Sequence, residues 1–110
     1  MSIHPHMAAG RWQEYPFAVQ MANVGGEVHR ARMAQERCAP EERVRHALER
    51  ALELLDLTRL SPPSAASRRE LGRLREAIAS QYVGVTWCHT DLAWLDRYFH
   101  QFALLAAARR

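Results

Sequence analysis

The sequence predicts an all-α protein folded as an antiparallel four-helix bundle, and three observations support this. Four segments carry apolar residues at the three- and four-residue spacing that marks one face of a helix. Proline, glycine, serine and threonine stand between these segments, where such residues start or stop helices. The β-branched stretch at residues 85–89 has no partner strand elsewhere in the sequence and is expected to be a loop. Amphipathic helices joined by short turns are typical of a bundle.

The chain is expected to form one domain behind a short arm. Its 110 residues are close to the commonest domain size, and a composition of 48% hydrophobic and 25% charged residues is ordinary for a globular protein. Residues 1–14 contain Pro5 and Gly10 and show no helical period. They predict a flexible N-terminal arm, with Trp12 as the residue that would hold it against the body. Residues 15–110 then form a single helical-bundle domain.

The first helix is predicted from about Pro16 to Arg37. Proline suits the first helical position because its missing N–H would have no partner there. The apolar stripe consists of Phe17, Met21, Val24, Val28 and Ala31. Gly25 and Gly26 lie in the middle of this helix, where two glycines cost about 1–2 kcal/mol relative to alanine. They either kink the helix or let another helix come close, and a break with a short loop is the remaining alternative.

The second helix is predicted from about Pro40 to Thr58 and has the strongest helical pattern in the chain. Glu41 and Glu42 in its first turn suit the positive end of the helix dipole. The stretch at residues 61–63, Ser-Pro-Pro, cannot continue a helix and separates this helix from the next. The stripe consists of Val44, Leu48, Ala51 and Leu55.

The third and fourth helices are delimited by capping residues. Ser67 and Glu70 have the spacing of a capping box, which predicts that the third helix starts at Ser67. Gly84 is expected to end this helix, and Thr90 is expected to cap the start of the fourth. The stripes consist of Leu71, Leu74, Ile78 and Tyr82 in the third helix and Leu92, Leu95, Phe99, Phe102 and Ala106 in the fourth.

The sequence lacks the motifs of common enzyme and cofactor sites. It has no glycine-rich phosphate loop, no G-x-S-x-G turn and no zinc-finger spacing of cysteine and histidine. Di-iron bundles use Glu-x-x-His, because that spacing points both ligands inward. No carboxylate stands three residues before any of the four candidates, which are His29, His46, His89 and His100. We therefore expect no metal and no cofactor, and we favour a protein that is not an enzyme.

Two carboxylate–histidine pairs do occur at the i, i+4 spacing that places both side chains on one helix face. They are Glu42 with His46 and Asp96 with His100. The favoured interpretation is two solvated pairs, each worth a few tenths of a kcal/mol. The alternative is a metal site with four ligands, which requires the two helices to be adjacent.

Arginine supplies all 15 basic residues of the chain, and the formal net charge is +3. The densest group lies on the predicted third helix and consists of Arg68, Arg69, Arg73 and Arg75. A row of this kind binds phosphates through bidentate hydrogen bonds, so it is a candidate nucleic-acid-binding face. A solvated face with local pairs to Glu70 and Glu76 is the favoured alternative.

Two surfaces are candidates for contact with another protein. Aromatic residues concentrate near the last helix, and most of them are expected in the core. An exposed subset, Trp94 and Tyr98, would mark an interface because aromatic side chains anchor interfaces. The second candidate is the face that carries Gly25 and Gly26.

Four stretches of the chain resemble a family of small uncharacterised bacterial proteins: residues 20–28 (QMANVGGEV), 49–58 (ERALELLDLT), 69–76 (RELGRLRE) and 98–103 (YFHQFA). The resemblance implies a compact helical protein of bacterial origin and brings no catalytic residue with it. Polar residues in or next to these stretches are candidates for a buried network between helices, although ordinary salt bridges are favoured. The candidate network consists of Asn23, Glu27, Arg30, Arg50 and Asp56.

His29, with Arg30 and Arg32 close to it in the sequence, invites comparison with RNA-cleaving helical bundles of the HEPN superfamily. Those enzymes carry an arginine followed four to six residues later by a histidine. No pair in this chain has that spacing: Arg43 and Arg97 each precede a histidine by three residues. The similarity is therefore one of fold only, and a HEPN-like nuclease or metal-binding bundle is the third of three hypotheses.

The first hypothesis is a non-enzymatic bundle that acts by association, as a homodimer or as an accessory subunit of a larger bacterial complex. The second is an accessory protein that binds RNA or DNA. No run of about 18 apolar residues is present, which argues against a membrane partner. The start of the chain lacks a secretory pattern, so we expect a cytoplasmic protein. Cys38 and Cys88 are expected to be reduced thiols, with a single bridge or a reactive thiol as alternatives.

Overall fold

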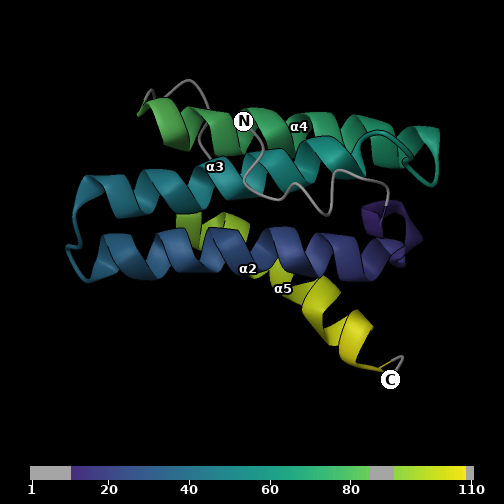
Figure 1. The fold of residues 1–110 in the computed structure, drawn as a ribbon, viewed down its shortest axis with the longest axis horizontal. Coiled ribbons are helices and arrows are strands. Elements are labelled where there is room, and N and C mark those ends of the chain that lie inside the picture. Colours follow the sequence, from purple (N-terminus) through teal and green to yellow (C-terminus); the bar gives the residue numbers. More distant parts are fainter. Residues whose placement is uncertain (1–10, 85–90, 109–110) are drawn as a thin grey trace.

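The computed structural model describes residues 11–84 and 91–108, which form four α-helices preceded by a short 3-10 turn (Figure 1). The elements are η1 (Arg11–Glu14), α2 (Phe17–Glu36), α3 (Glu41–Thr58), α4 (Ala65–Val83) and α5 (Leu92–Ala108). The predicted all-α four-helix bundle is confirmed. Within the described part of the chain, no helix is long and apolar enough to cross a membrane.

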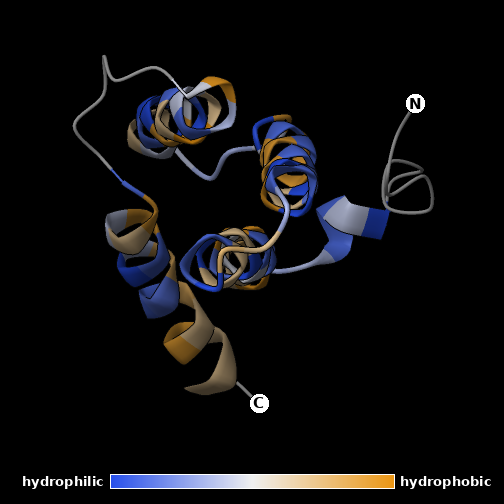
Figure 2. Ribbon diagram, turned by 90° about the vertical axis from the view of Figure 1, so that its left-hand side faces the viewer, coloured by the Kyte–Doolittle hydropathy of each residue, from blue (hydrophilic) through white to orange (hydrophobic). Residues whose placement is uncertain are grey.

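The helix α2 lies at the centre of the arrangement and packs against α3 on one side and α5 on the other. The helices α2, α3 and α4 run side by side in alternating directions, whereas α5 crosses α2 obliquely (Figure 1). The end view in Figure 2 shows the four helices around a common centre. It also shows the C-terminal turns of α5 leaving that centre, with a largely hydrophobic colour.

The core is built from the apolar stripes that define each helix. Its largest fully buried members are Trp12, Met21, Leu48, Leu55, Leu71, Ile78, Leu95 and Phe99. Seven of these eight residues lie at predicted stripe positions, and the eighth, Trp12, lies at the predicted contact of the arm with the body. Phe17 and Phe102, also predicted for the stripes, are only partly buried and pack edge to face against each other.

The helix ends follow the predicted signals with one exception. Pro16 and Pro40 stand directly before α2 and α3, and Gly84 ends α4 in the left-handed conformation, with φ of 76°. The predicted start of the third helix at Ser67 is wrong. The Ser64 hydroxyl accepts a hydrogen bond from the Ser67 backbone N–H at 3.0 Å, so α4 begins one turn earlier.

The start of α5 is capped by Asp91, whose Oδ1 accepts a hydrogen bond from the Trp94 backbone N–H at 2.8 Å. This bond satisfies one of the free donors at the helix N-terminus. The predicted cap, Thr90, and the predicted loop at residues 85–89 lie outside the described residues.

Both glycines in the middle of α2 are helical, and α2 runs through them without a break. Gly25 is buried, and a Cβ atom placed on it would lie 2.5 Å from Cβ of Phe99 in α5. Close approach of another helix, one of the predicted alternatives, is therefore confirmed at Gly25. A Cβ atom on Gly26 would meet no atom within 4 Å.

The turn η1 is bound to the body by buried hydrogen bonds. Nε1 of the buried Trp12 donates to Oγ1 of Thr58 at 3.0 Å, and Thr58 in turn donates to the Leu54 carbonyl oxygen at 2.9 Å. Nε2 of the buried Gln20 donates to the carbonyl oxygens of Trp12 and Tyr15 at 2.9 and 3.1 Å. Residues 11–14 of the predicted arm are thus packed, and residues 1–10 lie outside the described residues.

Candidate functional site

Several partly or largely exposed apolar side chains lie along α5 and are called here the α5 surface. Its members are Trp94, Tyr98, Phe102, Leu104 and Leu105. The rings of Trp94 and Tyr98 stack with centroids 5.5 Å apart, and Tyr98 contacts Phe102 at 5.7 Å. The exposed fractions of Trp94, Leu104 and Leu105 are 45%, 60% and 49%. Half of the six large exposed hydrophobic residues in the described part of the chain therefore lie on this one helix.

The sequence identified Trp94 and Tyr98 on this surface but not the two leucines. The predicted stripe of the fourth helix contains its buried residues, which are Leu92, Leu95, Phe99 and Ala106, but it says nothing about the apolar residues outside the stripe. Leu104 and Leu105 stay exposed because α5 crosses α2 obliquely, so that its last turns extend past the body (Figure 1).

The Tyr98 hydroxyl is partly buried between α5 and α4, where it lies close to Glu70. The pKa of Tyr98 is raised to about 12, first by burial and then by the nearby Glu70 carboxylate on α4, which repels the phenolate and accepts a hydrogen bond from the phenol. The folded protein therefore prefers the protonated phenol more strongly than an unfolded chain, in which tyrosine has a pKa of about 10.

We expect the stability of the protein to fall between about pH 10 and pH 12 because of Tyr98. Its contribution is complete below the unfolded pKa of about 10 and is lost as the pH approaches the folded pKa of about 12. Urea unfolding at fixed protein concentration across this pH range measures the effect. Tyr98→Phe, which cannot ionise, should show a smaller fall than the wild type. An equal fall in the two proteins would contradict the assignment.

Two of the four arginines on the predicted face of the third helix form ion pairs. Arg73 binds Glu70 at 3.1 Å, and Arg75 binds Asp56 of α3 at 2.7 and 3.3 Å, a bond that raises the pKa of Arg75. An open depression of 750 Å³ is lined by Asp56, Arg59, Arg69, Gly72, Arg73, Arg75 and Glu76. Arg68 does not line it, and two carboxylates do, which lowers its positive charge.

The predicted polar network divides into two separate groups of ion pairs. Buried Glu27 pairs with Arg30 and with Arg50, whose Nε lies 2.6 Å from Oε2 of Glu27. Asp56 pairs with Arg75 instead, and with Arg59 at 3.6 Å. Asn23 is exposed, and its amide donates to the Val19 carbonyl oxygen within α2 at 2.9 Å.

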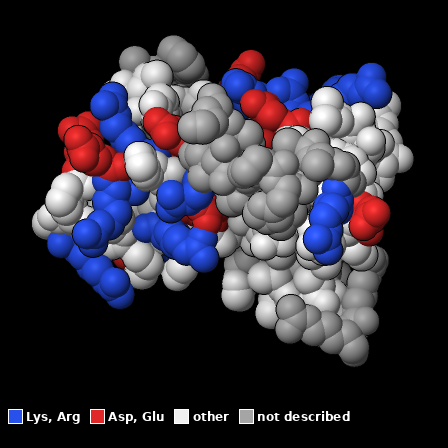
Figure 3. All heavy atoms as spheres, in the orientation of Figure 1, with Lys and Arg blue, Asp and Glu red and all other residues white. Residues whose placement is uncertain are grey.

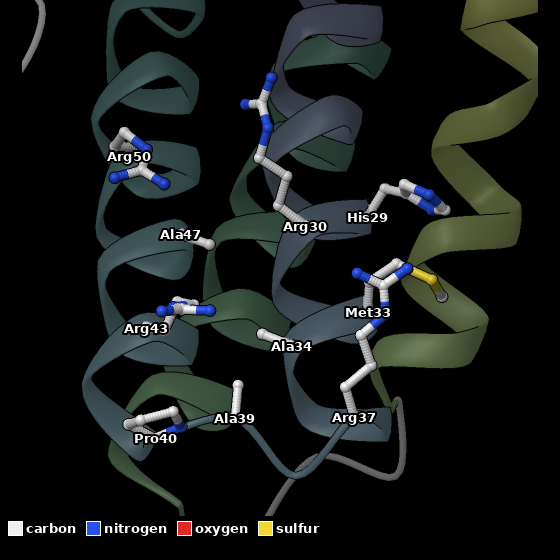
Figure 4. Close-up of a pocket in the computed structure, with 10 residues that line it drawn as sticks. All are labelled: His29, Arg30, Met33, Ala34, Arg37, Ala39, Pro40, Arg43, Ala47 and Arg50. Atoms are coloured by element: carbon white, nitrogen blue, oxygen red, sulfur yellow. The ribbon is translucent and has the colours of Figure 1, made fainter.

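The structure also brings together four arginines that the sequence interpretation did not group. A pocket of 630 Å³, called here the arginine pocket, lies between α2 and α3 (Figure 4). Arg30 of α2 and Arg37, which directly follows α2, line one side of it, and Arg43 and Arg50 of α3 line the other. Its other lining residues are His29, Met33, Ala34, Ala39, Pro40 and Ala47. In Figure 3 basic side chains gather over the same end of the molecule, where α2 leads into α3.

A signal for this pocket exists in the sequence. Arg30 and Arg37 are seven residues apart, as are Arg43 and Arg50, and the two pairs stand on opposite sides of the turn at residues 38–40. A spacing of seven places both members of a pair on one helix face. A short turn then brings the two faces into one groove, provided that the helices are rotated suitably.

The carboxylate–histidine pairs are not joined in a metal site. Oδ2 of Asp96 lies 2.9 Å from Nδ1 of His29 and 3.2 Å from Nη1 of Arg32, both in α2. His46 lies on exposed surface of α3, and His100 lines a separate groove beside Gly25. Across residues 11–84 and 91–108, no group of three or more His, Cys, Asp and Glu residues could hold a metal ion.

Comparison with known proteins does not indicate a function for this chain. No protein-family model, curated protein or solved structure matches this chain. Function is therefore inferred from the α5 surface, the arginine face of α4 and the arginine pocket.

Proposed function

We propose that this protein is a non-enzymatic cytoplasmic helical bundle, of the bacterial kind that it resembles, and that it acts by association with a second copy of itself. The observation that carries the proposal is the exposure of Leu104 and Leu105 at 60% and 49%, on helical turns that extend past the body. Exposed apolar side chains that are contiguous are characteristic of contact surfaces.

The charge of the α5 surface favours a second copy as its occupant. Residues 98–108 contain no Asp, Glu, Lys or Arg, so this part of α5 offers no charge that would select a different partner. In a two-fold dimer the same patch meets itself, which an uncharged apolar patch can do without repulsion.

The spacing of the α5 residues also suits an antiparallel pair of helices. Trp94 and Leu105 are eleven residues apart, about three helical turns, and so lie on one side of α5. When two copies of α5 pair in opposite directions, Trp94 of one copy lies opposite Leu105 of the other. Trp94 of each copy would then cover the exposed Leu105 of the other copy, and the Trp94 ring would act as the anchor of the interface.

The decisive experiment is solution mass by light scattering at low and high salt. We expect the wild type to have twice its chain mass of 12.6 kDa, and we expect the dimer to survive high salt because apolar contact is not screened. Leu105→Glu should convert it to a monomer, since it would bury an unpaired charge at the interface.

Leu60→Glu is the matched control. Leu60 follows α3 and is 71% exposed, so the same substitution is made on an exposed leucine away from the α5 surface. This variant should remain a dimer. A monomeric wild type would contradict self-association, and a dimer that persists in Leu105→Glu would place the contact on another face.

The arginine face of α4 is the weaker basis for a function. Arg73 and Arg75 are engaged by Glu70 and Asp56, so a nucleic-acid phosphate would have to displace protein carboxylates to reach them. RNA or DNA binding through Arg68, Arg69, Arg73 and Arg75 therefore remains the alternative proposal. It predicts nucleic acid that co-purifies with the protein and is released by salt.

A further inference from the structure

We propose that the arginine pocket between α2 and α3 is a binding site for a small organic phosphate of about nucleotide size. This inference concerns a part of the molecule that the proposed self-association does not use. It rests on four properties of the pocket: unpaired positive charge, two oriented guanidinium groups, an apolar floor, and a neighbouring helix N-terminus.

The positive charge of the pocket is only partly neutralised. The guanidinium groups of Arg37 and Arg43 make no ion pair or hydrogen bond with any residue of the described chain. Arg30 and Arg50 share the single buried carboxylate of Glu27. Glu42 lines an adjoining depression with Arg43 and Arg50 and is not part of the lining of the pocket. The lining itself contains four guanidinium groups and no carboxylate, so the pocket is cationic and an anion would neutralise it.

Glu27 orients two of the arginines before any ligand binds. Its side chain is almost completely buried, and it accepts the Nε–H of Arg50 at 2.6 Å and an Nη–H of Arg30. An arginine has five N–H donors, so each guanidinium keeps others for a phosphate. Holding these long side chains in place reduces the entropy that binding would otherwise cost.

The floor of the pocket is apolar, which distinguishes it from a simple cluster of surface charges. Buried Ala34 and Ala47 lie between the arginines, with Met33, Ala39 and Pro40 beside them (Figure 4). The volume of 630 Å³ lies within the range of about 300–1,000 Å³ typical of small-molecule sites. The ligand that suits this lining has a phosphate group for the arginines and a hydrophobic or planar part for the floor.

The pocket lies at the start of α3, an 18-residue helix whose first residues follow Pro40. No side-chain hydrogen bond caps this N-terminus. Free backbone N–H groups and the positive end of the helix dipole favour an anion there. Arg43 belongs to the first turn of the same helix and lines the pocket together with Pro40.

Three exposed carboxylates beside the pocket argue against an extended nucleic-acid strand. Glu36 ends α2, and Glu41 and Glu42 begin α3, so all three flank the turn next to the pocket. A phosphate backbone that continued past the pocket over this turn would be repelled by them. A compact phosphate that ends within the pocket would avoid them, which favours the small ligand.

The test is calorimetric titration of the full chain with adenosine diphosphate, pyrophosphate and adenosine at low ionic strength. Adenosine diphosphate should bind more tightly than pyrophosphate, and adenosine should give no measurable heat. Arg37→Gln/Arg43→Gln should weaken binding of adenosine diphosphate by about tenfold or more, since each arginine supplies charged hydrogen bonds. Neither arginine has a side-chain partner among the described residues, so this variant should fold normally, which its circular dichroism and melting curve would show.

Arg68→Gln/Arg69→Gln is the control because it removes the same charge from exposed positions of α4. It should bind adenosine diphosphate like the wild type. An equal loss in both double variants would mean that net charge alone is recognised, and pyrophosphate binding as tight as that of adenosine diphosphate would exclude a role for the apolar floor. Tighter binding of a single-stranded oligonucleotide than of adenosine diphosphate, or no binding of either, would overturn the proposal.

Discussion

Trp12→Ala should destabilise the protein by about 3–5 kcal/mol, the cost of removing a fully buried tryptophan from a packed core. Trp12 is 1% exposed, and its indole N–H donates to Thr58 at the end of α3. The substitution leaves a cavity and also releases η1, whose backbone is held by Gln20. Urea unfolding followed by circular dichroism measures the loss.

Tyr15→Ala is the appropriate comparison for Trp12→Ala. Tyr15 lies in the same segment and contacts the Trp12 ring edge to face, but it is exposed. Its removal should cost less than about 1 kcal/mol, as is usual for a surface position. If both variants lost a similar amount of unfolding free energy, Trp12 would contribute no more than an exposed residue, which would contradict its place in the core.

Gly26→Ala should stabilise the protein and Gly25→Ala should not, although the two glycines are neighbours in one helix. Both substitutions improve helix propensity by about 1 kcal/mol. At Gly25 the new methyl group would lie 2.5 Å from Cβ of Phe99, an atom fixed to the α5 backbone, so α5 itself must move. Overpacking of this kind costs about 1–3 kcal/mol, and shifting α5 would also disturb the α5 surface.

At Gly26 the methyl group would meet no atom within 4 Å, so only the gain in helix propensity remains. Thermal or urea unfolding of the pair should therefore place Gly26→Ala above the wild type and Gly25→Ala at or below it. If both alanines were stabilising, α5 would not be packed against Gly25 in solution. The pair thus tests the contact that sets the direction of α5.

The local features of this fold could be predicted from the sequence because each of them depends on residues that are close to it in the chain. Prolines before α2 and α3, Gly84 after α4 and the three- and four-residue stripes all act over a few residues, and the structure agrees with them. The error at Ser67 is of the same local kind. Two serines three residues apart can each serve as a cap, and the fold uses Ser64, which adds one turn to α4.

The number of helices, most of their ends and most of their buried residues are therefore predictable from the sequence. The tertiary structure is needed to know which arginines of different helices come together and which apolar residues outside the stripes stay exposed. Arg30, Arg37, Arg43 and Arg50 form one pocket only because α2 and α3 are rotated to face each other across their turn. Leu104 and Leu105 are exposed only because α5 crosses α2 obliquely over Gly25. Helix rotation and crossing angle depend on how side chains from distant segments interlock, and no pattern within one segment encodes them.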